Sequence, residues 1–141
     1  MRKNSKERNK MNLVSSQICK TGDIGIYNNL FGGKMLAWLD EAGGTFAASV
    51  CCTPNMITLK MDEVVFKKPV KVNDHIRIYG EVSRMGNSSL TIILEARRFN
   101  FSAHNEELVC STTITFVRID EYGQSVPIGN DIRKKYKHLI K

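Results

Sequence analysis

The stretch Phe-Gly-Gly-Lys-Met-Leu-Ala-Trp-Leu-Asp-Glu-Ala-Gly-Gly, residues 31–44, decides the fold of this chain. Its apolar positions recur with a helical period that continues beyond the stretch: Met35, Leu36, Leu39, Ala42, Phe46, Ala47 and Val50. This spacing, sustained over about four turns, predicts one long helix with a buried face. Pro54 follows as a stop signal, so we expect the helix to end near residues 51–53.

Asp40 lies at the margin of this apolar stripe, close to Gly33 and Gly44 on a helical wheel. A carboxylate beside a core-facing stripe costs desolvation energy unless a partner or a function offsets that cost. Gly43 and Gly44 each cost about 1 kcal/mol relative to alanine inside a helix. These choices favour a helix that a sheet wraps closely and a carboxylate with a chemical role. The alternatives are a structural Asp40, ion-paired or hydrogen-bonded to a neighbouring backbone group, and glycines that serve packing alone.

Composition indicates a single globular domain. The chain has 141 residues, of which 42% are hydrophobic and 25% are charged. No apolar run approaches the ~20 residues of a membrane span, and the charged N-terminus does not resemble a signal peptide. The four cysteines are Cys19, Cys51, Cys52 and Cys110. Because they lack Cys-x-x-Cys spacing, we expect reduced thiols in a cytoplasmic protein.

The net charge of +7 lies entirely in the two ends of the chain. Residues 1–10 and 131–141 each hold five basic residues and one acidic residue, whereas residues 11–130 hold eleven basic and twelve acidic ones. We therefore divide the chain into a basic N-terminal tail (1–10), one domain (11–128) and a basic C-terminal tail (129–141) that forms a short helix or stays disordered. Nucleic-acid binding by the tails is a weaker hypothesis, because the body carries no basic surface.

After the helix the pattern alternates with period two, as strands with one buried face do. The alternating stretches are residues 57–66, 76–85, 90–96 and 108–116. An apolar segment at residues 11–19 predicts a first strand, and a Gly- and Asn-containing loop at residues 20–30 leads into the helix. A strand, a helix and four strands joined by short turns predict an α+β fold, with the helix against one face of an antiparallel sheet.

Several short motifs resemble those of the hotdog-fold acyl-CoA thioesterases, over residues 20–127. The motifs are Phe31-Gly32-Gly33, Asp40 seven residues later, Thr58, residues 66–70, Asn73-Asp74 and residues 86–89. The likeness is greatest to broad-specificity bacterial acyl-CoA hydrolases and their brain-type relatives. It implies a curved antiparallel sheet wrapped around one long central helix. It also implies a homodimer, in some members assembled into tetramers or hexamers.

The resemblance also implies roles for individual residues. Asp40 would be the catalytic acid, Gly32 and Gly33 would offer backbone N–H groups to the thioester oxygen, and Thr58 would face the same site. One position departs from the family, because Gly25 stands where an asparagine is usual. The nearby Asn28 and Asn29 are the candidates to replace it.

The chemistry of the residues agrees with these roles. The start of a helix carries unpaired N–H groups and a partial positive charge, which suit a developing oxyanion. Asp40 suits a general base or a nucleophile, and the sequence does not distinguish the two. Gly33 and Asp40 are about 10.5 Å apart along a helix, too far to serve one carbonyl carbon. We therefore expect a composite site at a dimer interface.

Other residues are candidates for binding coenzyme A. Lys67, Lys68 and Lys71 suit its phosphates, and Asn87, Ser88 and Ser89 suit its pantetheine or nucleotide channel; the alternatives are solvated lysines and a plain hairpin turn. Trp38 and Phe46 are candidates for the end of the acyl pocket or for the core. The three histidines, His75, His104 and His138, are scattered, so we expect no metal and no cofactor beyond coenzyme A within substrate and product.

The leading hypothesis is therefore an acyl-CoA thioesterase. A non-catalytic acyl-CoA-binding protein of the same fold, acting as a sensor or regulator, is the alternative. The glycine at position 25 favours the sensor slightly, and Asp40 opposes it. A hotdog dehydratase lacks support, because no histidine lies at the helix start.

Overall fold

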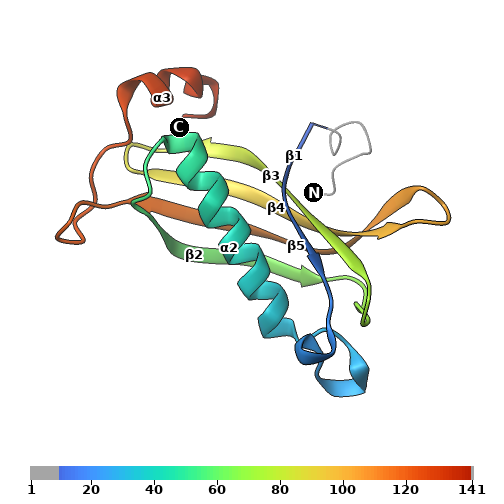
Figure 1. Cartoon of the computed structure of the whole chain (residues 1–141). Helices are drawn as coiled ribbons and strands as arrows, with labels where there is room; N and C mark the ends of the chain where they lie inside the picture. Colours follow the sequence, from blue (N-terminus) through green and yellow to red (C-terminus); the bar gives the residue numbers. More distant parts are fainter. Residues whose placement is uncertain (1–9, 141) are drawn as a thin grey trace.

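The computed structural model describes residues 10–140, in which one long helix, α2 (Gly32–Cys51), lies across the concave face of a five-stranded sheet (Figure 1). The strands are β1 (Asn12–Ile18), β2 (Met56–Phe66), β3 (His75–Met85), β4 (Ser89–Asn100) and β5 (Asn105–Arg118). Short helical turns are η1 (Thr21–Asp23), η2 (Ile26–Asn28), α3 (Asn130–Lys135) and η3 (Lys137–Leu139). The predicted order of one strand, a helix and four strands is confirmed. None of the described helices is long and apolar enough to cross a membrane.

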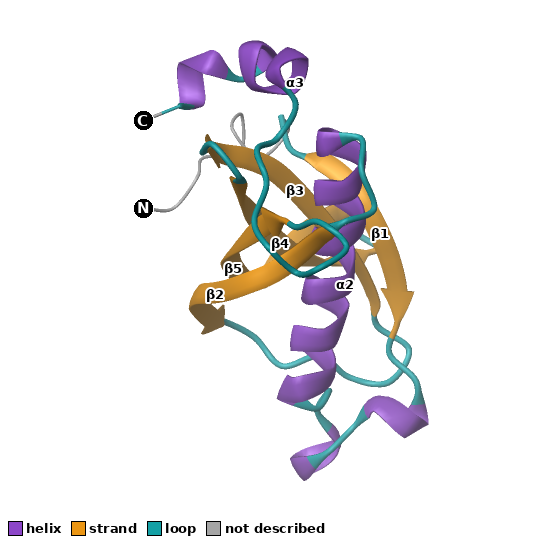
Figure 2. Cartoon of the chain, turned by 90° about the vertical axis from the view of Figure 1, so that its left-hand side faces the viewer, coloured by secondary structure: helices purple, strands orange, loops and turns teal. Residues whose placement is uncertain are grey.

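The sheet is antiparallel throughout, with strand order β1-β3-β4-β5-β2, and it curves around α2 (Figure 2). β2 pairs with β5 and not with β3, so the expectation of short turns between all four strands is wrong for residues 67–74. Alternation identifies strands but not their partners. This connection runs beside the helix start, where the Leu30 N–H donates a 2.7 Å hydrogen bond to the Val70 carbonyl. The crossing therefore brings Lys67 and Lys68 close to α2.

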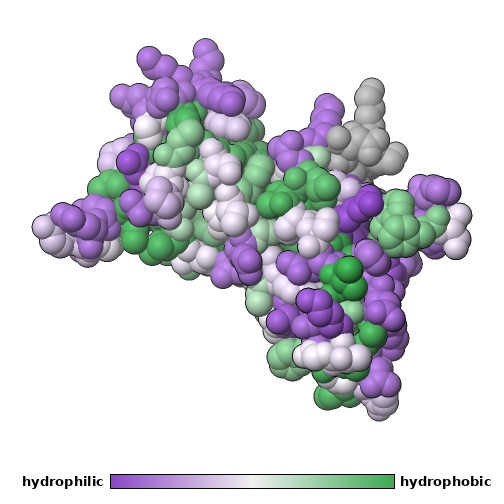
Figure 3. Space-filling model, viewed as in Figure 1, coloured by the Kyte–Doolittle hydropathy of each residue, from purple (hydrophilic) through white to green (hydrophobic). Residues whose placement is uncertain are grey.

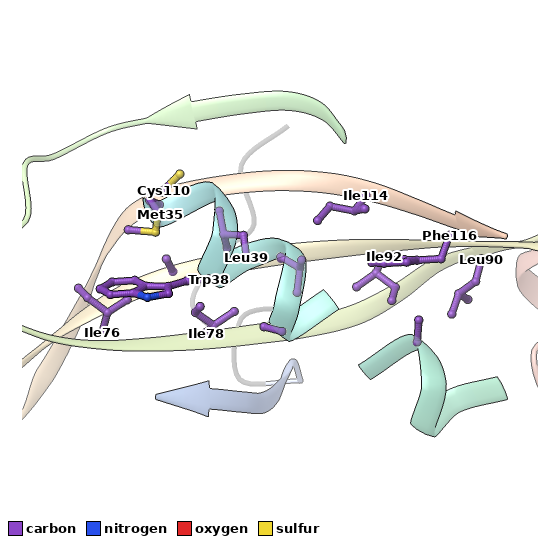
Figure 4. Close-up of a cluster of buried hydrophobic side chains, with 14 of the residues drawn as sticks. Met35, Trp38, Leu39, Ile76, Ile78, Leu90, Ile92, Cys110, Ile114 and Phe116 are labelled. Atoms are coloured by element: carbon purple, nitrogen blue, oxygen red, sulfur yellow. The ribbon is translucent and has the colours of Figure 1, made fainter. Parts of the chain in front are cut away.

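The core fills the space between α2 and the concave face of the sheet (Figure 4). Its members include Met35, Trp38 and Leu39 from the helix and Ile76, Ile78, Leu90, Ile92, Cys110, Ile114 and Phe116 from the sheet. Alternate residues of each strand face the helix, which is why the period-two pattern located the strands. Trp38 is buried in this cluster and Phe46 packs against it, as the core alternative predicted.

Gly43 and Gly44 are adjacent in α2 but have different surroundings. A Cβ atom on Gly43 would lie 2.9 Å from Phe116 Cζ and 3.0 Å from Leu94 Cδ1. A Cβ atom on Gly44 would come no closer than 3.9 Å, to Phe116 Cε1. Gly43 therefore allows the helix to approach the sheet closely, and Gly44 does not have this constraint.

We expect Gly43→Ala to lower the free energy of unfolding by about 1 kcal/mol. Overpacking a core costs about 1–3 kcal/mol, and the better helix propensity of alanine returns about 1 kcal/mol of that. Gly44→Ala is the matched control, and it should raise stability by up to about 1 kcal/mol. Urea unfolding of both variants measures the difference. Equal effects at the two positions would show that the close approach at Gly43 is unimportant.

The C-terminal segment packs against the body through three apolar residues. Ile132, Tyr136 and Ile140 contact the core cluster, and Ile140 also pairs with Met85. The short helix is one of the two states expected for residues 129–141. The three apolar residues are spaced four apart, as on one face of a helix, but the many basic residues between them make this pattern hard to recognise in the sequence. Of the basic N-terminal tail, only Lys10 lies within the described residues.

Candidate active site

Asp40 lies half-buried about two turns into α2, and Thr58 of β2 faces it. The Thr58 hydroxyl donates a 2.6 Å hydrogen bond to Asp40 Oδ1. No Lys, Arg or His among the described residues forms an ion pair with Asp40, so the structural salt-bridge alternative finds no partner there. The fold thus brings together two residues that the resemblance assigned to one site. It leaves Asp40 Oδ2 without a hydrogen-bond partner in the described part of the chain.

The start of α2 presents free hydrogen-bond donors. Phe31 is the N-cap residue, and its carbonyl accepts hydrogen bonds from the N–H groups of Lys34 (2.9 Å) and Met35 (3.2 Å). The N–H groups of Gly32 and Gly33 have no acceptor within residues 10–140, as expected in a first helical turn. These donors and the positive end of the helix dipole are suited to bind negative charge.

A pocket of about 370 Å³ opens beside the helix start. Its lining comprises Asn29, Leu30, Gly32, Met35, Phe66, Lys67, Lys68, Pro69, Val70 and Val109. The volume is in the range of small-molecule sites. The pocket brings one predicted oxyanion glycine together with two lysines predicted to bind coenzyme A and with one of the candidate asparagines.

The two pocket lysines differ in their partners. Lys68 forms a 2.8 Å ion pair with Glu107, which also accepts hydrogen bonds from Arg98. The hydrogen bonds from Lys68 and Arg98 hold the pKa of the Glu107 carboxyl below its ordinary value. Lys67 has no side-chain partner among the residues that the structure describes. Its ammonium group is therefore available to an anionic ligand, whereas that of Lys68 is partly neutralised.

The loop before the helix is held by Lys71. The Lys71 ammonium donates hydrogen bonds to the side-chain oxygen of Asn29 and, at 3.2 Å, to the Tyr27 carbonyl. Asn29 lines the pocket, whereas Asn28 is exposed and outside the lining, with a left-handed φ of 59°. Of the two candidates to replace the usual asparagine, the structure therefore brings Asn29 to the pocket.

Other predicted residues are not brought to the pocket within one subunit. The turn at Asn87–Ser89 lies at the opposite end of the sheet, next to α3 (Figure 1). Its backbone is bound there, because the N–H groups of Ile128 and Arg118 donate to the Asn87 and Ser88 carbonyls, at 2.8 and 2.9 Å. Asp40 is also absent from the pocket lining, about 10.5 Å along the helix from Gly33.

The cysteines show no environment of a reactive thiol. Burial raises the pKa of Cys51 and of Cys110 to about 11, so both thiols stay protonated near neutral pH. Cys52 is exposed, but it lies at the far end of α2 from the pocket. The described residues include no group of three or more His, Cys, Asp or Glu side chains arranged to hold a metal ion.

Several residues that the structure brings to the helix start received no site role in the sequence analysis. Phe66, Met35 and Val109 line the pocket, and the ring of Phe31 lies against Gly33. Apolar atoms are visible on the surface at this lower end of the molecule (Figure 3). The sequence alone does not distinguish an exposed phenylalanine from one that packs in the core.

The sequence profile of the Thioesterase superfamily matches residues 27–100. An uncharacterized acyl-CoA thioester hydrolase of Bacillus subtilis is 30% identical over 130 residues, which cover 89% of this chain and 75% of that protein. A hexameric hotdog fold thioesterase of Campylobacter jejuni superposes with a TM-score of 0.78 at 28% identity, covering 89% of this chain and 96% of that chain. The aspartate-to-alanine mutant of a hexameric broad specificity acyl-coenzyme A thioesterase gives a TM-score of 0.83 at 22% identity, covering 92% and 98%. Sequence, fold and site together show that this chain is a hotdog-fold protein that belongs to the thioesterase superfamily.

Proposed function

We propose that this chain, an acyl-CoA thioesterase, hydrolyses its substrate with Asp40 of one subunit and the helix start of another. Asp40 is the observation that carries the proposal. It is a half-buried helical carboxylate whose single hydrogen-bond partner in the described chain is Thr58. A carboxylate with one free oxygen and no neighbouring cation is suited to accept a proton or to attack a carbonyl carbon.

The reaction consumes one water molecule and releases a free acid and coenzyme A. In the general-base route, Asp40 takes a proton from water while the water oxygen attacks the thioester carbon. The carbonyl electron pair moves to its oxygen, which the N–H groups of Gly32 and Gly33 stabilise. The C–S bond then breaks, and the proton on Asp40 passes to the leaving thiolate. In the nucleophilic route, the Asp40 carboxylate attacks the carbon itself, and the C–S bond breaks to release the coenzyme A thiolate and leave a mixed anhydride. Water then hydrolyses this anhydride, which frees the acid, restores the Asp40 carboxylate and supplies the proton that the thiolate takes up.

Both routes need two subunits, because Gly33 and Asp40 lie about 10.5 Å apart on one helix. β2, which carries Thr58, is an edge strand, and its Ile57 and Leu59 side chains are 47% and 62% exposed. An exposed apolar edge next to Asp40 favours an interface at that place. We propose a homodimer as the catalytic unit, assembled further into a tetramer or a hexamer. The second subunit is also the candidate source of the Asn87–Ser89 turn.

Lys67 is proposed to bind a phosphate of coenzyme A at the mouth of the pocket, with Lys68 beside it. We expect Lys67→Glu to raise KM for acyl-CoA about fivefold at low salt with little change in kcat, because an exposed charge contact contributes about 1 kcal/mol. Steady-state kinetics at two salt concentrations measures this effect. Lys10→Glu makes the same charge change at an exposed residue before β1 that does not line the pocket, and it should leave KM unchanged. A fivefold rise in both variants would mean that net charge, and not Lys67, sets the affinity.

The test of the function is thiol release from a panel of short, long and aromatic acyl-CoAs. Saturable turnover with any member supports the thioesterase, and the preferred member defines the acyl group. Binding of acyl-CoA without turnover by any member would instead favour the non-catalytic sensor. Residues 11–128 with the packed C-terminal segment are proposed as the unit that carries the activity, and a cytoplasmic location with reduced cysteines stays a prediction.

A further inference from the structure

Two phenylalanine rings flank the glycines at the helix start. A Cβ atom on Gly33 would lie 2.8 Å from Phe31 Cε2, and one on Gly32 would lie 3.6 Å from Phe66 Cζ. The two phenylalanine residues are nevertheless 63% and 55% exposed. The free N–H groups of the helix start are therefore close to two large apolar side chains that the described chain leaves open to solvent.

The exposure of Phe31 does not come from a loose backbone. Its N–H donates a 2.9 Å hydrogen bond to the Asp23 carbonyl, and its own carbonyl caps the first helical turn. Asp23 in turn forms a 3.5 Å ion pair with Lys34 in that turn. The backbone of Phe31 is thus fixed between two pocket-lining residues, Leu30 and Gly32, while most of the ring surface stays exposed. This exposure indicates that a ligand or a partner group covers the ring.

The ring of Phe31 also limits the space for a side chain at position 25. A Cβ atom on Gly25 would lie 3.3 Å from Phe31 Cδ1, on the opposite edge of the ring from the atom that meets Gly33. A side chain at position 25 would therefore compete with the ring for the same space. Gly25 and Phe31 form a matched pair.

We infer that Phe31 and Phe66 are positioning residues for the thioester, and this inference rests on the proposed function. The two rings flank the slot through which the carbonyl reaches the N–H groups of Gly32 and Gly33. They exclude water there, which strengthens the hydrogen bonds to the oxyanion as charge develops. Because this effect grows in the transition state, it acts on kcat more than on ground-state binding.

The test compares Phe31→Ala and Phe66→Ala with Tyr27→Ala, which truncates an aromatic ring that is 86% exposed in the same loop as the helix start. We expect each phenylalanine variant to lower kcat about tenfold, while the Kd for free coenzyme A, which has no thioester carbonyl, changes less than about twofold. Tyr27→Ala should keep kcat. Calorimetric titration with coenzyme A and the oligomeric mass accompany the kinetics.

A second comparison tests the matched pair without any need for turnover. Gly25→Asn should lower the midpoint of thermal unfolding more in the wild-type background than in the Phe31→Ala background. The inference is overturned if the wild type is active and Phe31→Ala keeps its kcat, if Tyr27→Ala loses as much, or if Phe31→Ala changes the oligomeric mass. A wild type that hydrolyses no acyl-CoA would overturn the proposed function itself.

Discussion

Replacing Asp40 by asparagine should lower kcat for acyl-CoA hydrolysis by about 10²–10⁴-fold, the usual range for loss of a general acid or base. Asparagine keeps the shape of the side chain and an oxygen that accepts the 2.6 Å hydrogen bond from Thr58. It removes only the ability to take a proton or to attack as a carboxylate. We therefore expect the free energy of unfolding and the affinity for acyl-CoA to stay close to those of the wild type.

Glu41→Gln is the matched control, because it neutralises the next carboxylate along α2, whose side chain is exposed. It should keep full turnover. Thiol release, thermal unfolding and acyl-CoA titration on both variants distinguish a thioesterase from a non-catalytic sensor. Turnover within a few-fold of wild type for Asp40→Asn would remove the carboxylate from the mechanism. Equal affinities of the wild type and Asp40→Asn for acyl-CoA, with no turnover by either protein, would point to a sensor.

The fold was predictable from sequence because its two periodicities are clear. The helical spacing from Met35 to Val50 gave the long helix, and alternation gave the strands. The alternating pattern predicted a strand that is shorter than β4 at its C-terminal end. Arg97 and Arg98 interrupt the alternation there, at a register shift between Ala96 and Arg97. The pattern could not reveal that β2 pairs with β5, because pairing depends on the path of residues 67–74, which runs beside the helix start.

The site was predictable only in part, because its residues come from separate elements. Asp40 and Thr58 are 18 residues apart, and only the packing of α2 against the β2 edge brings them within 2.6 Å. Thr58 alone in a strand has no functional signal. The pocket depends on residues 67–74, the connection between β2 and β3, which brings Lys67 and Lys68 to the helix start. The Asn87–Ser89 turn of the same subunit does not reach the pocket. A composite site cannot be completed from one chain by pattern alone.

Gly32→Pro should lower kcat by about 10²–10³-fold, the cost of losing one oxyanion donor. Proline has no N–H group and is favoured at the first position of a helix. Phe31 already has φ −62° and ψ 131°, the conformation that suits a residue before proline. No hydrogen bond in the described chain is lost, because the Gly32 N–H has no acceptor there. Gly32→Ala is the control, since it adds a Cβ atom but keeps the N–H, and it should lower kcat far less than Gly32→Pro.

Mixed dimers of Gly32→Pro and Asp40→Asn subunits decide whether the site is composite. If each site combines the helix start of one subunit with Asp40 of its neighbour, a mixed dimer holds one intact site and one site with both defects. Random assembly makes half of the dimers mixed, so co-expressed variants should recover about one quarter of wild-type turnover from two nearly inactive parents. If instead one subunit supplied both groups, every site would carry one defect, and the mixture would stay as inactive as its parents. Two affinity tags isolate the mixed dimers, in which recovery should rise to about one half, because one of their two sites is intact.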